Sequence, residues 1–247
     1  MKNLYPLTIF FILLNILVTQ APVSAQGSME VSESRLLSEY FDNVYGADER
    51  LVSGPFYYGA IRGSIQGHPY YFDEDWKTGS VEIGDVRFDN LLLKYDISID
   101  QFILKYITTN NASYQVGLRS GNITKIIVGL HTFVPLPESR DTISVPFAEL
   151  LSDGKVQYMV TKSKYLVLTN GSGMTDYVYK ENLRQYLYTN NQMVPFRGKK
   201  ALFNLYPELK AQLKQYARKN GLVLGPSKLQ DRAKWIDQCN YLLEAGK

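Results

Sequence analysis

The order of apolar and polar positions divides the chain into a long central part and two ends. Between residues 51 and 196, apolar and polar residues alternate with a period of two. This period is typical of strands that bury one face and expose the other. Turn signals such as Gly84-Asp85 and Asn190-Asn191 interrupt the alternation at short intervals. The pattern predicts about nine or ten short antiparallel strands, arranged as a barrel or a strongly curved sheet rather than a parallel α/β fold.

A change of parity marks one position in this central part. Apolar residues are odd-numbered from Leu91 to Ile99 and even-numbered from Phe102 to Tyr106. Because one extra residue exchanges the two faces of a strand, the change predicts a bulge or a turn near residues 96–101. Later in the chain, apolar and aromatic residues form groups that predict separate strands: Val156–Val160, Tyr165–Leu168, Tyr177–Tyr179 and Tyr186–Tyr188.

Helical spacing appears on both sides of the alternating part. Apolar residues recur every three or four positions over residues 36–45, and Gly46 follows as a helix stop. The same spacing returns over residues 206–217 and 229–243. The fold class is therefore mainly β (α+β), an antiparallel curved sheet or barrel with one N-terminal and two C-terminal helices. We expect a single domain over residues 26–247, whose helical segment covers about 199–243; the alternative is a β domain to about residue 196 with a separate helical tail.

The first 25 residues have the organisation of a secretory signal peptide. A positively charged start precedes an apolar run over residues 4–18, and small residues precede the expected cleavage after Ala25. Pro6 and Asn15 interrupt the apolar run, which makes an uncleaved anchor helix the less favoured alternative. No Cys follows the cleavage point, so a lipoprotein is not expected. We expect a periplasmic or secreted protein with no transmembrane segment after signal removal.

Composition and charge exclude several functional classes. The chain has 27 basic and 24 acidic side chains, a balance too small to indicate a nucleic-acid partner. Its 45% hydrophobic and 21% charged residues are ordinary for a globular domain. The single cysteine, Cys239, excludes an intramolecular disulfide, and with only His68 and His131 available it excludes a thiolate zinc site. We expect no cofactor.

Signatures of nucleophilic catalysis are missing. The Gly-x-Ser-x-Gly nucleophile elbow does not occur. Cys239 lies on the apolar stripe of the last predicted helix, which favours a buried, unreactive thiol. His68 and His131 are each expected to be surface or turn residues rather than a catalytic base.

Acidic residues give two weak chemical signals. Asp73-Glu74-Asp75 lies in a predicted connection without the spacing of an EF-hand loop, so a solvated loop is preferred to a calcium site. Asp96 and Asp100 flank the parity change, which favours hydrogen bonding within a turn. The alternative is a glycan hydrolase that uses paired carboxylates from among Asp73, Asp75, Asp96 and Asp100, and two carboxyl groups converging in one cleft would mark it.

Tyrosine is the most unusual feature of the composition, with 19 residues. Alternate tyrosines on neighbouring antiparallel strands would form a cross-strand aromatic ladder. Structural packing is the simpler interpretation, and the functional one is a stacking face for a sugar, lipid or peptide. The candidate ligand-binding residues are Tyr70, Tyr71, Tyr177, Tyr179, Tyr186 and Tyr188.

Three segments resemble a group of exported proteins of unknown function in Bacteroidota. They are Asp75-Trp-Lys-Thr-Gly-Ser-Val81, Leu92-Leu-Lys-Tyr-Asp-Ile-Ser-Ile-Asp-Gln101, and the ending from Leu202 to Gly221. The resemblance implies a Gram-negative envelope location, a β-rich body and a helical tail, and it brings no catalytic residues. In such bacteria Asp141-Thr142-Ile143 resembles an O-glycosylation acceptor.

These observations favour an exported soluble envelope protein without enzymatic activity. It would bind an unknown small molecule, a glycan or an envelope protein through the curved sheet. The envelope glycan hydrolase described above and a structural or assembly factor remain as alternatives.

Overall fold

A computed structural model describes residues 48–59, 65–108, 111–137, 147–171 and 174–246. These residues belong to one unit, Asp48–Lys247. The expected signal peptide, the expected helix over residues 36–45 and the Asp141-Thr142-Ile143 motif lie outside the described residues.

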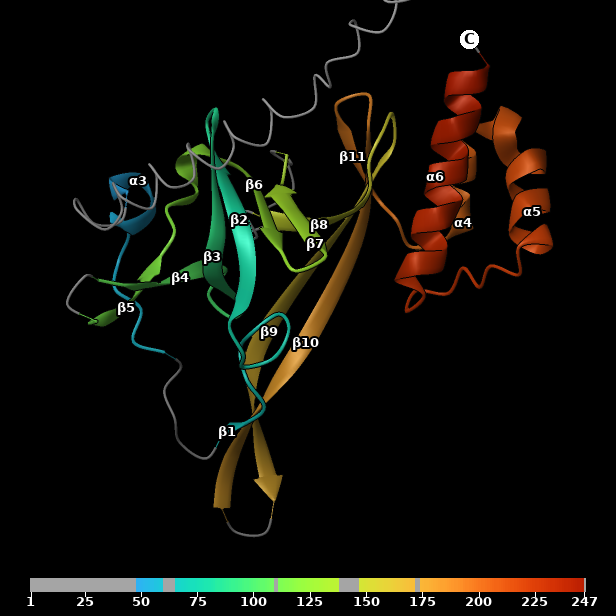
Figure 1. Cartoon of the computed structure of the whole chain (residues 1–247). Coiled ribbons are helices and arrows are strands. Elements are labelled where there is room, and N and C mark those ends of the chain that lie inside the picture. Colours follow the sequence, from blue (N-terminus) through green and yellow to red (C-terminus); the bar gives the residue numbers. More distant parts are fainter. Residues whose placement is uncertain (1–47, 60–64, 109–110, 138–146, 172–173, 247) are drawn as a thin grey trace, which may run out of the picture. The chain divides into compact units, whose positions relative to one another are not determined.

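The described part of the chain is mainly β and is built on one curved, open sheet (Figure 1). Its strands follow the order β1-β10-β9-β8-β7-β6-β2-β3-β4-β5, and β11 pairs with β10. All pairings between these strands are antiparallel except that of β1 with β10. The strands are β1 (Ile65–Gln66), β2 (Lys77–Ile83), β3 (Val86–Asp96), β4 (Gln101–Ile107), β5 (Ser113–Gly117), β6 (Ile123–Val128), β7 (His131–Pro135), β8 (Phe147–Ser152), β9 (Gln157–Gly171), β10 (Met174–Thr189) and β11 (Gln192–Pro195). The predicted fold class is confirmed, in the form of a curved sheet rather than a closed barrel.

The predicted turns connect neighbouring strands. Gly84 (φ 57°) lies in the β2–β3 turn, and Asn190 (φ 50°) and Asn191 (φ 58°) form the β10–β11 turn. Two consecutive residues with positive φ match the right-handed twist of a hairpin, and Asn tolerates this conformation. The parity change is also a turn, because β3 and β4 are joined through Asp100 at φ 56°.

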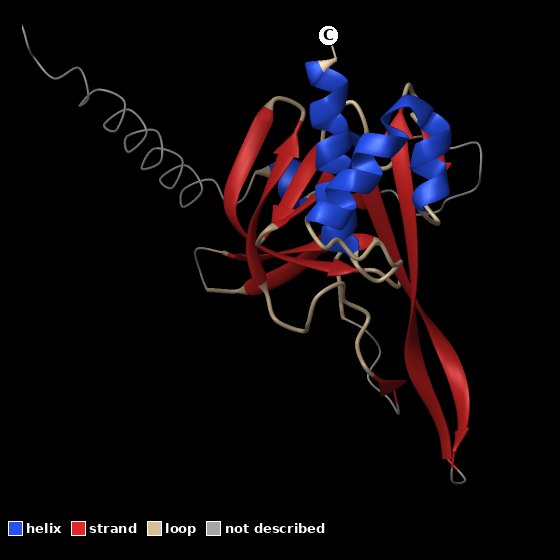
Figure 2. Ribbon diagram, turned by 90° about the vertical axis from the view of Figure 1, so that its right-hand side faces the viewer, coloured by secondary structure: helices blue, strands red, loops and turns tan. Residues whose placement is uncertain are grey.

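The prediction of four short strands over residues 156–188 is wrong, because the structure has two long strands there. The groups at 156–160 and 165–168 lie largely in β9, and those at 177–179 and 186–188 both lie in β10; β9 and β10 pair without a register shift (Figure 2). Polar residues over 161–164 and 180–182 suggested interruptions. However, β8 pairs only with the first part of β9, so much of this hairpin is a two-stranded ribbon with no need for continuous apolar alternation.

The main hydrophobic core lies on one face of strands β2 to β7. Its aromatic centre contains Tyr95 and Phe102, whose ring centroids are 4.0 Å apart, and Phe133 packs edge-on against both. The short helix α3 (Glu49–Val52) adds Leu51 to this core. The carboxylate of Asp48 caps α3 by accepting a hydrogen bond from the backbone N–H of its second residue.

A second core joins the sheet to the C-terminal helices. These helices are α4 (Lys199–Leu205), the 3₁₀ turn η2 (Pro207–Leu209), α5 (Lys210–Lys219) and α6 (Leu229–Ala245). The expected C-terminal helices correspond to α5 and α6. Trp235 and Cys239 of α6 are fully buried beside Tyr158 of β9 and Leu187 of β10. Burial raises the pKa of Cys239 to about 12, as expected for an unreactive thiol. No described helix combines the length and apolarity that a membrane span requires.

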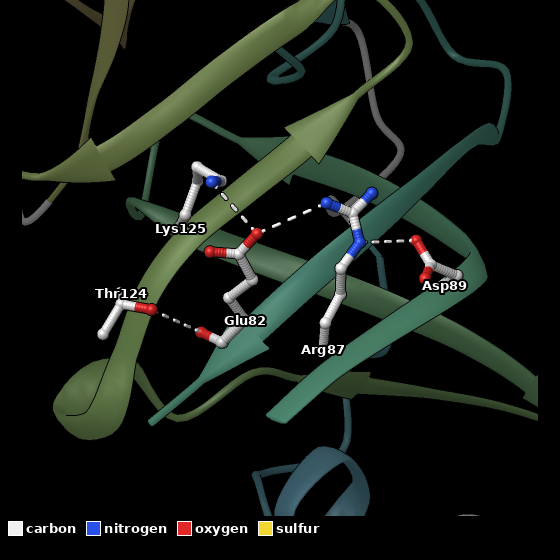
Figure 3. A network of polar contacts seen from close by, with 5 residues as sticks. All are labelled: Glu82, Arg87, Asp89, Thr124 and Lys125. Carbon is white, nitrogen blue, oxygen red and sulfur yellow. Dashed lines mark hydrogen bonds and ion pairs between the residues drawn. The ribbon is translucent and has the colours of Figure 1, made fainter. Parts of the chain in front are cut away.

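A polar network covers part of β2, β3 and β6 (Figure 3). Glu82 pairs with Lys125 at 3.0 Å and with Arg87 at 3.4 Å, and Arg87 also pairs with Asp89 at 2.9 Å. Thr124 hydrogen-bonds the backbone carbonyl of Glu82. The charged partners are partly solvent-exposed and satisfy one another, so we interpret this network as a solvated surface rather than a binding site.

Candidate functional site

Aromatic rings and lysines meet on the face of β3 and β4 that points away from the main core. Lys94 alternates along β3 with the buried Leu93 and Tyr95, so its side chain lies on the opposite face. Its ammonium nitrogen is 4.7 Å from the ring centroid of Tyr70 and 4.6 Å from that of Trp76. The ammonium of Lys105 on β4 is 5.9 Å from Trp76. We call Tyr70, Trp76, Lys94 and Lys105 the Trp76 platform.

The loop that carries Trp76 is held by its own acidic residues. Asp73 accepts a hydrogen bond from the backbone N–H of Asp75 at 2.9 Å and pairs with Lys77 at 2.7 Å. An aspartate that binds the backbone two residues ahead stabilises a turn. The acidic triplet is thus a turn that leads into β2 and presents Trp76 beside Lys94.

The segment that carries Tyr70 is fixed to the end of β3. The backbone N–H of Tyr71 donates to the Tyr95 carbonyl at 2.8 Å, and the N–H of Ile97 donates to the Pro69 carbonyl at 3.0 Å. The ammonium of Lys164 on β9 donates to the carbonyl of Tyr70 at 2.6 Å. Backbone and side-chain contacts from two strands therefore determine the position of Tyr70.

Asp96 is the buried polar group behind the platform. It is 2% exposed. One carboxylate oxygen accepts the hydroxyl of Tyr57 at 2.7 Å, and the other accepts both the backbone N–H and the hydroxyl of Ser98. The hydroxyl of Tyr57 also lies 3.5 Å from that of Tyr70. The expected hydrogen bonding of Asp96 within a turn is present, and Tyr57 extends it to the platform.

The platform offers both hydrogen-bond donors and acceptors. Neither Lys94 nor Lys105 forms an ion pair with a carboxylate of the described residues. Burial lowers the pKa of Lys94, while the negative charges of Glu74 and Asp75 favour its charged form. Ammonium donors thus lie over the half-buried rings of Tyr70 and Trp76, and the carboxylates of Glu74 and Asp75 lie close enough to act on Lys94.

The structure brings together only some of the candidate tyrosines. Tyr179 lies beside the segment that leads to Tyr70, because a Cβ atom added at Gly67 would be 3.8 Å from the Cβ atom of Tyr179. Burial raises the pKa of the Tyr179 phenol. Tyr177 shares the face of Tyr179 and is 42% exposed. Tyr186 and Tyr188 have the other parity and therefore point to the opposite face of β10.

The buried tyrosines belong to the packed interior. Tyr186 is 6% exposed and packs with Ala148 and Met159. Tyr71 is 7% exposed and packs in the main core. The aromatic surface is therefore formed around Tyr70, and the sequence analysis did not single out Trp76, Lys94 or Lys105. The available signal was a tryptophan at the end of an acidic turn.

A second polar cluster lies within the aromatic core. The carboxylate of Glu149, 5% exposed, accepts a hydrogen bond from the hydroxyl of Tyr71 and contacts the Nδ1 atom of His131 with its other oxygen. The ring of Phe72 lies 4.7 Å from the imidazole of His131. The ammonium of Lys162 lies 4.4 Å from the ring of Tyr71. We call these five residues the Glu149 cluster.

The carboxylates considered for a glycan hydrolase have separate partners. Asp73 binds Lys77 in the surface turn, and Asp96 binds Tyr57 and Ser98. Asp100 accepts the hydroxyl of Tyr95 at 2.6 Å, and burial raises the pKa of Asp100 to about 6. None of these three shares a hydrogen bond with another, and no group of three or more potential metal ligands occurs among the described residues.

Comparisons of the chain with protein families, with curated proteins and with solved structures gave no match.

Proposed function

We propose that the protein is an exported carbohydrate-binding module and that the Trp76 platform is its sugar-binding surface. The observation that carries this proposal is the arrangement of Trp76 and Tyr70 around the ammonium of Lys94, with Lys105 beside them. These side chains come from the sheet and from a loop fixed by hydrogen bonds, so the surface is formed before a ligand arrives.

The chemistry of a sugar ring matches this surface. The faces of an aromatic ring carry negative charge, and the C–H groups on one face of a pyranose are weakly positive, so the two pack together. The hydroxyl groups at the edge of the sugar need donors and acceptors. Lys94 and Lys105 supply donors, and the carboxylates of Glu74 and Asp75 near Lys94 supply acceptors.

The expected export supports the same proposal. A secretory signal over residues 1–25 would carry the protein to a compartment that contains cell-surface and environmental glycans. The resemblance to exported Bacteroidota proteins agrees with this location.

Binding of the purified full chain to a panel of immobilised neutral and acidic glycans tests the proposal. Trp76→Ala should weaken binding of any retained glycan by about fivefold, because an aromatic stacking contact contributes on the order of 1 kcal/mol. Tyr241→Ala is the matched control, since Tyr241 is 64% exposed on α6. A panel without any bound glycan, or equal binding by Trp76→Ala and the wild-type chain, would overturn the proposal.

A further inference from the structure

The Glu149 cluster contains a carboxylate that packing does not require. Glu149 pairs with Phe133 across β7 and β8, and its side chain lies among the aromatic residues of the main core. Burying a carboxylate is unfavourable unless its oxygens are hydrogen-bonded, and an apolar side chain of similar size often packs equally well. A glutamate in this place therefore indicates a role beyond filling space.

The contacts of Glu149 determine the tautomer and the orientation of the His131 imidazole. The Nδ1–H of His131 donates to one oxygen of Glu149, and the hydroxyl of Tyr71 donates to the other. The two donors give each oxygen of the carboxylate a hydrogen-bond partner and fix its direction. The ring of Phe72 packs on the imidazole at 4.7 Å and limits its rotation. With the proton on Nδ1, the Nε2 atom of His131 is a hydrogen-bond acceptor.

The Nε2 atom of His131 is available to a ligand from solvent. The side chain of His131 is 40% exposed, whereas that of Glu149 is 6% exposed. Within the part of the chain that the structure describes, Nε2 makes no hydrogen bond, and no serine, threonine or cysteine side chain binds the imidazole. This arrangement combines an accessible base with a buried group that orients it, as a general base that acts on water requires.

We propose that His131 is a general base for the hydrolysis of carboxylic esters and that Glu149 and Tyr71 are its positioning residues. Nε2 of His131 takes one proton from water as the water oxygen bonds to the carbonyl carbon and the carbonyl electron pair moves to oxygen. The intermediate then collapses, the bond to the alcohol oxygen breaks, and that oxygen takes the proton from Nε2. The products are one carboxylic acid and one alcohol.

Ester hydrolysis is the reaction class that this cluster fits. One imidazole that takes and returns a single proton is sufficient for it, whereas glycoside hydrolysis uses two carboxyl groups on opposite sides of the bond. The ammonium of Lys162 lies 4.4 Å from the ring of Tyr71 and pairs with Glu181 at 3.9 Å, so we assign it no role in the reaction.

The tautomer of His131 gives a first test that needs no substrate. The chain has two histidines, so His68→Gln leaves the ¹⁵N signals of His131 alone in the NMR spectrum. We expect the Nδ1–H tautomer, and Glu149→Gln should change the ring signals. A neutral Nε2–H tautomer in the folded chain would contradict the proposal.

Hydrolysis of p-nitrophenyl acetate by the full chain is the second test. His131→Gln should lower the rate by about 100-fold, the lower end of what a general base contributes. His68→Gln is the matched control and should leave the rate unchanged. Tyr241→Ala, at a position that is 64% exposed on α6, is a second control and should also leave the rate unchanged.

The test of Glu149 and Tyr71 must use a measurement that changes if they position His131 and does not change if they only stabilise the fold. Glu149→Gln and Tyr71→Phe should each shift the midpoint of the pH–rate profile, with circular dichroism confirming the fold. If Glu149→Gln does not fold, Tyr71→Phe and the tautomer of His131 still decide the point. A rate in His131→Gln equal to the wild-type rate, or a pH profile unchanged in both positioning variants, would overturn the proposal.

Discussion

The guanidinium of Arg232 lies 2.7 Å from the side-chain oxygen of Gln185 and joins α6 to β10. Arg232 is 1% exposed, and no carboxylate of the described residues pairs with it. Instead it donates to the carbonyls of Phe196 and Leu224 and lies 4.7 Å from the ring of Phe196. The oxygens that it satisfies come from three different segments, so this one side chain ties the helices to the sheet.

Arg232→Met should lower the free energy of unfolding by about 3 kcal/mol, because it leaves the carbonyls of Phe196 and Leu224 without this donor while it keeps most of the apolar volume. Equilibrium denaturation in urea measures the change. Lys234→Met on the exposed side of α6 is the control and should have little effect. Equal midpoints for the two variants would show that Arg232 does not hold the second core together.

Tyr57→Phe should destabilise the protein by about 1–2 kcal/mol, because it removes a hydrogen bond to the buried carboxylate of Asp96. The same change should weaken glycan binding, since Tyr57 also lies beside the hydroxyl of Tyr70. Thermal denaturation and the glycan-binding measurement together test both effects. Tyr58→Phe is the control, because Tyr58 is 93% exposed. Equal thermal stability and equal glycan binding for the two variants would show that the hydrogen bond from Tyr57 to Asp96 does not support the platform.

Local chemistry explains why the turns could be predicted. Asn190 and Asn191 are adjacent residues that both tolerate positive φ, so the sequence carries the turn without help from the rest of the fold. The lengths of β9 and β10, in contrast to the turns, could not be predicted from the local sequence. Lys162 and Lys164 interrupt the apolar alternation, yet the strand continues because long stretches of pairing between β9 and β10 do not need a buried face.

The Trp76 platform and the Glu149 cluster could not be predicted from one short segment of sequence in the way that the turns could. His131 and Glu149 are 18 positions apart, and Tyr71 is 78 positions from Glu149. They meet because β7 pairs with β8 in a register that places Glu149 beside Phe133, and because the segment around Tyr71 pairs with the end of β3. Such contacts depend on sheet order and register, which periodicity alone does not determine.

The stability of the protein should fall as the pH rises from about 4 to about 6, through the titration of Asp100. Burial raises its pKa in the folded protein to about 6, above the value of about 3.9 in an unfolded chain. In this window the folded state binds more protons than the unfolded state, so deprotonation favours unfolding.

Asp100→Asn should remove this fall in stability and leave the protein more stable at neutral pH by about 1–2 kcal/mol, after allowance for partial solvent exposure. Asn keeps the oxygen that accepts the hydroxyl of Tyr95 and tolerates the positive φ of 56°. Urea denaturation of both chains at several pH values measures the effect. Parallel stability curves for Asp100→Asn and the wild-type protein would exclude Asp100 as the titrating group.

Gly154 tests the contact between the β8–β9 connection and α6. It has φ 143°, and a Cβ atom placed there would lie 2.7 Å from the side-chain amide of Asn240. That amide is not free to move, because its oxygen accepts the backbone N–H of Val156 at 2.8 Å and its nitrogen donates to the carbonyl of Val156 at 2.9 Å. A methyl group at Gly154 should therefore both strain the backbone and break these hydrogen bonds.

Gly154→Ala should destabilise the protein by about 3 kcal/mol, whereas Gly84→Ala should cost about 1 kcal/mol. Gly84 also has a positive φ, of 57°, but a Cβ atom there would meet nothing within 4 Å. The difference between the two variants in urea denaturation isolates the loss of the Asn240 contacts from the cost of the backbone conformation. Equal losses would mean that Asn240 adjusts without weakening the attachment of α6 to the sheet.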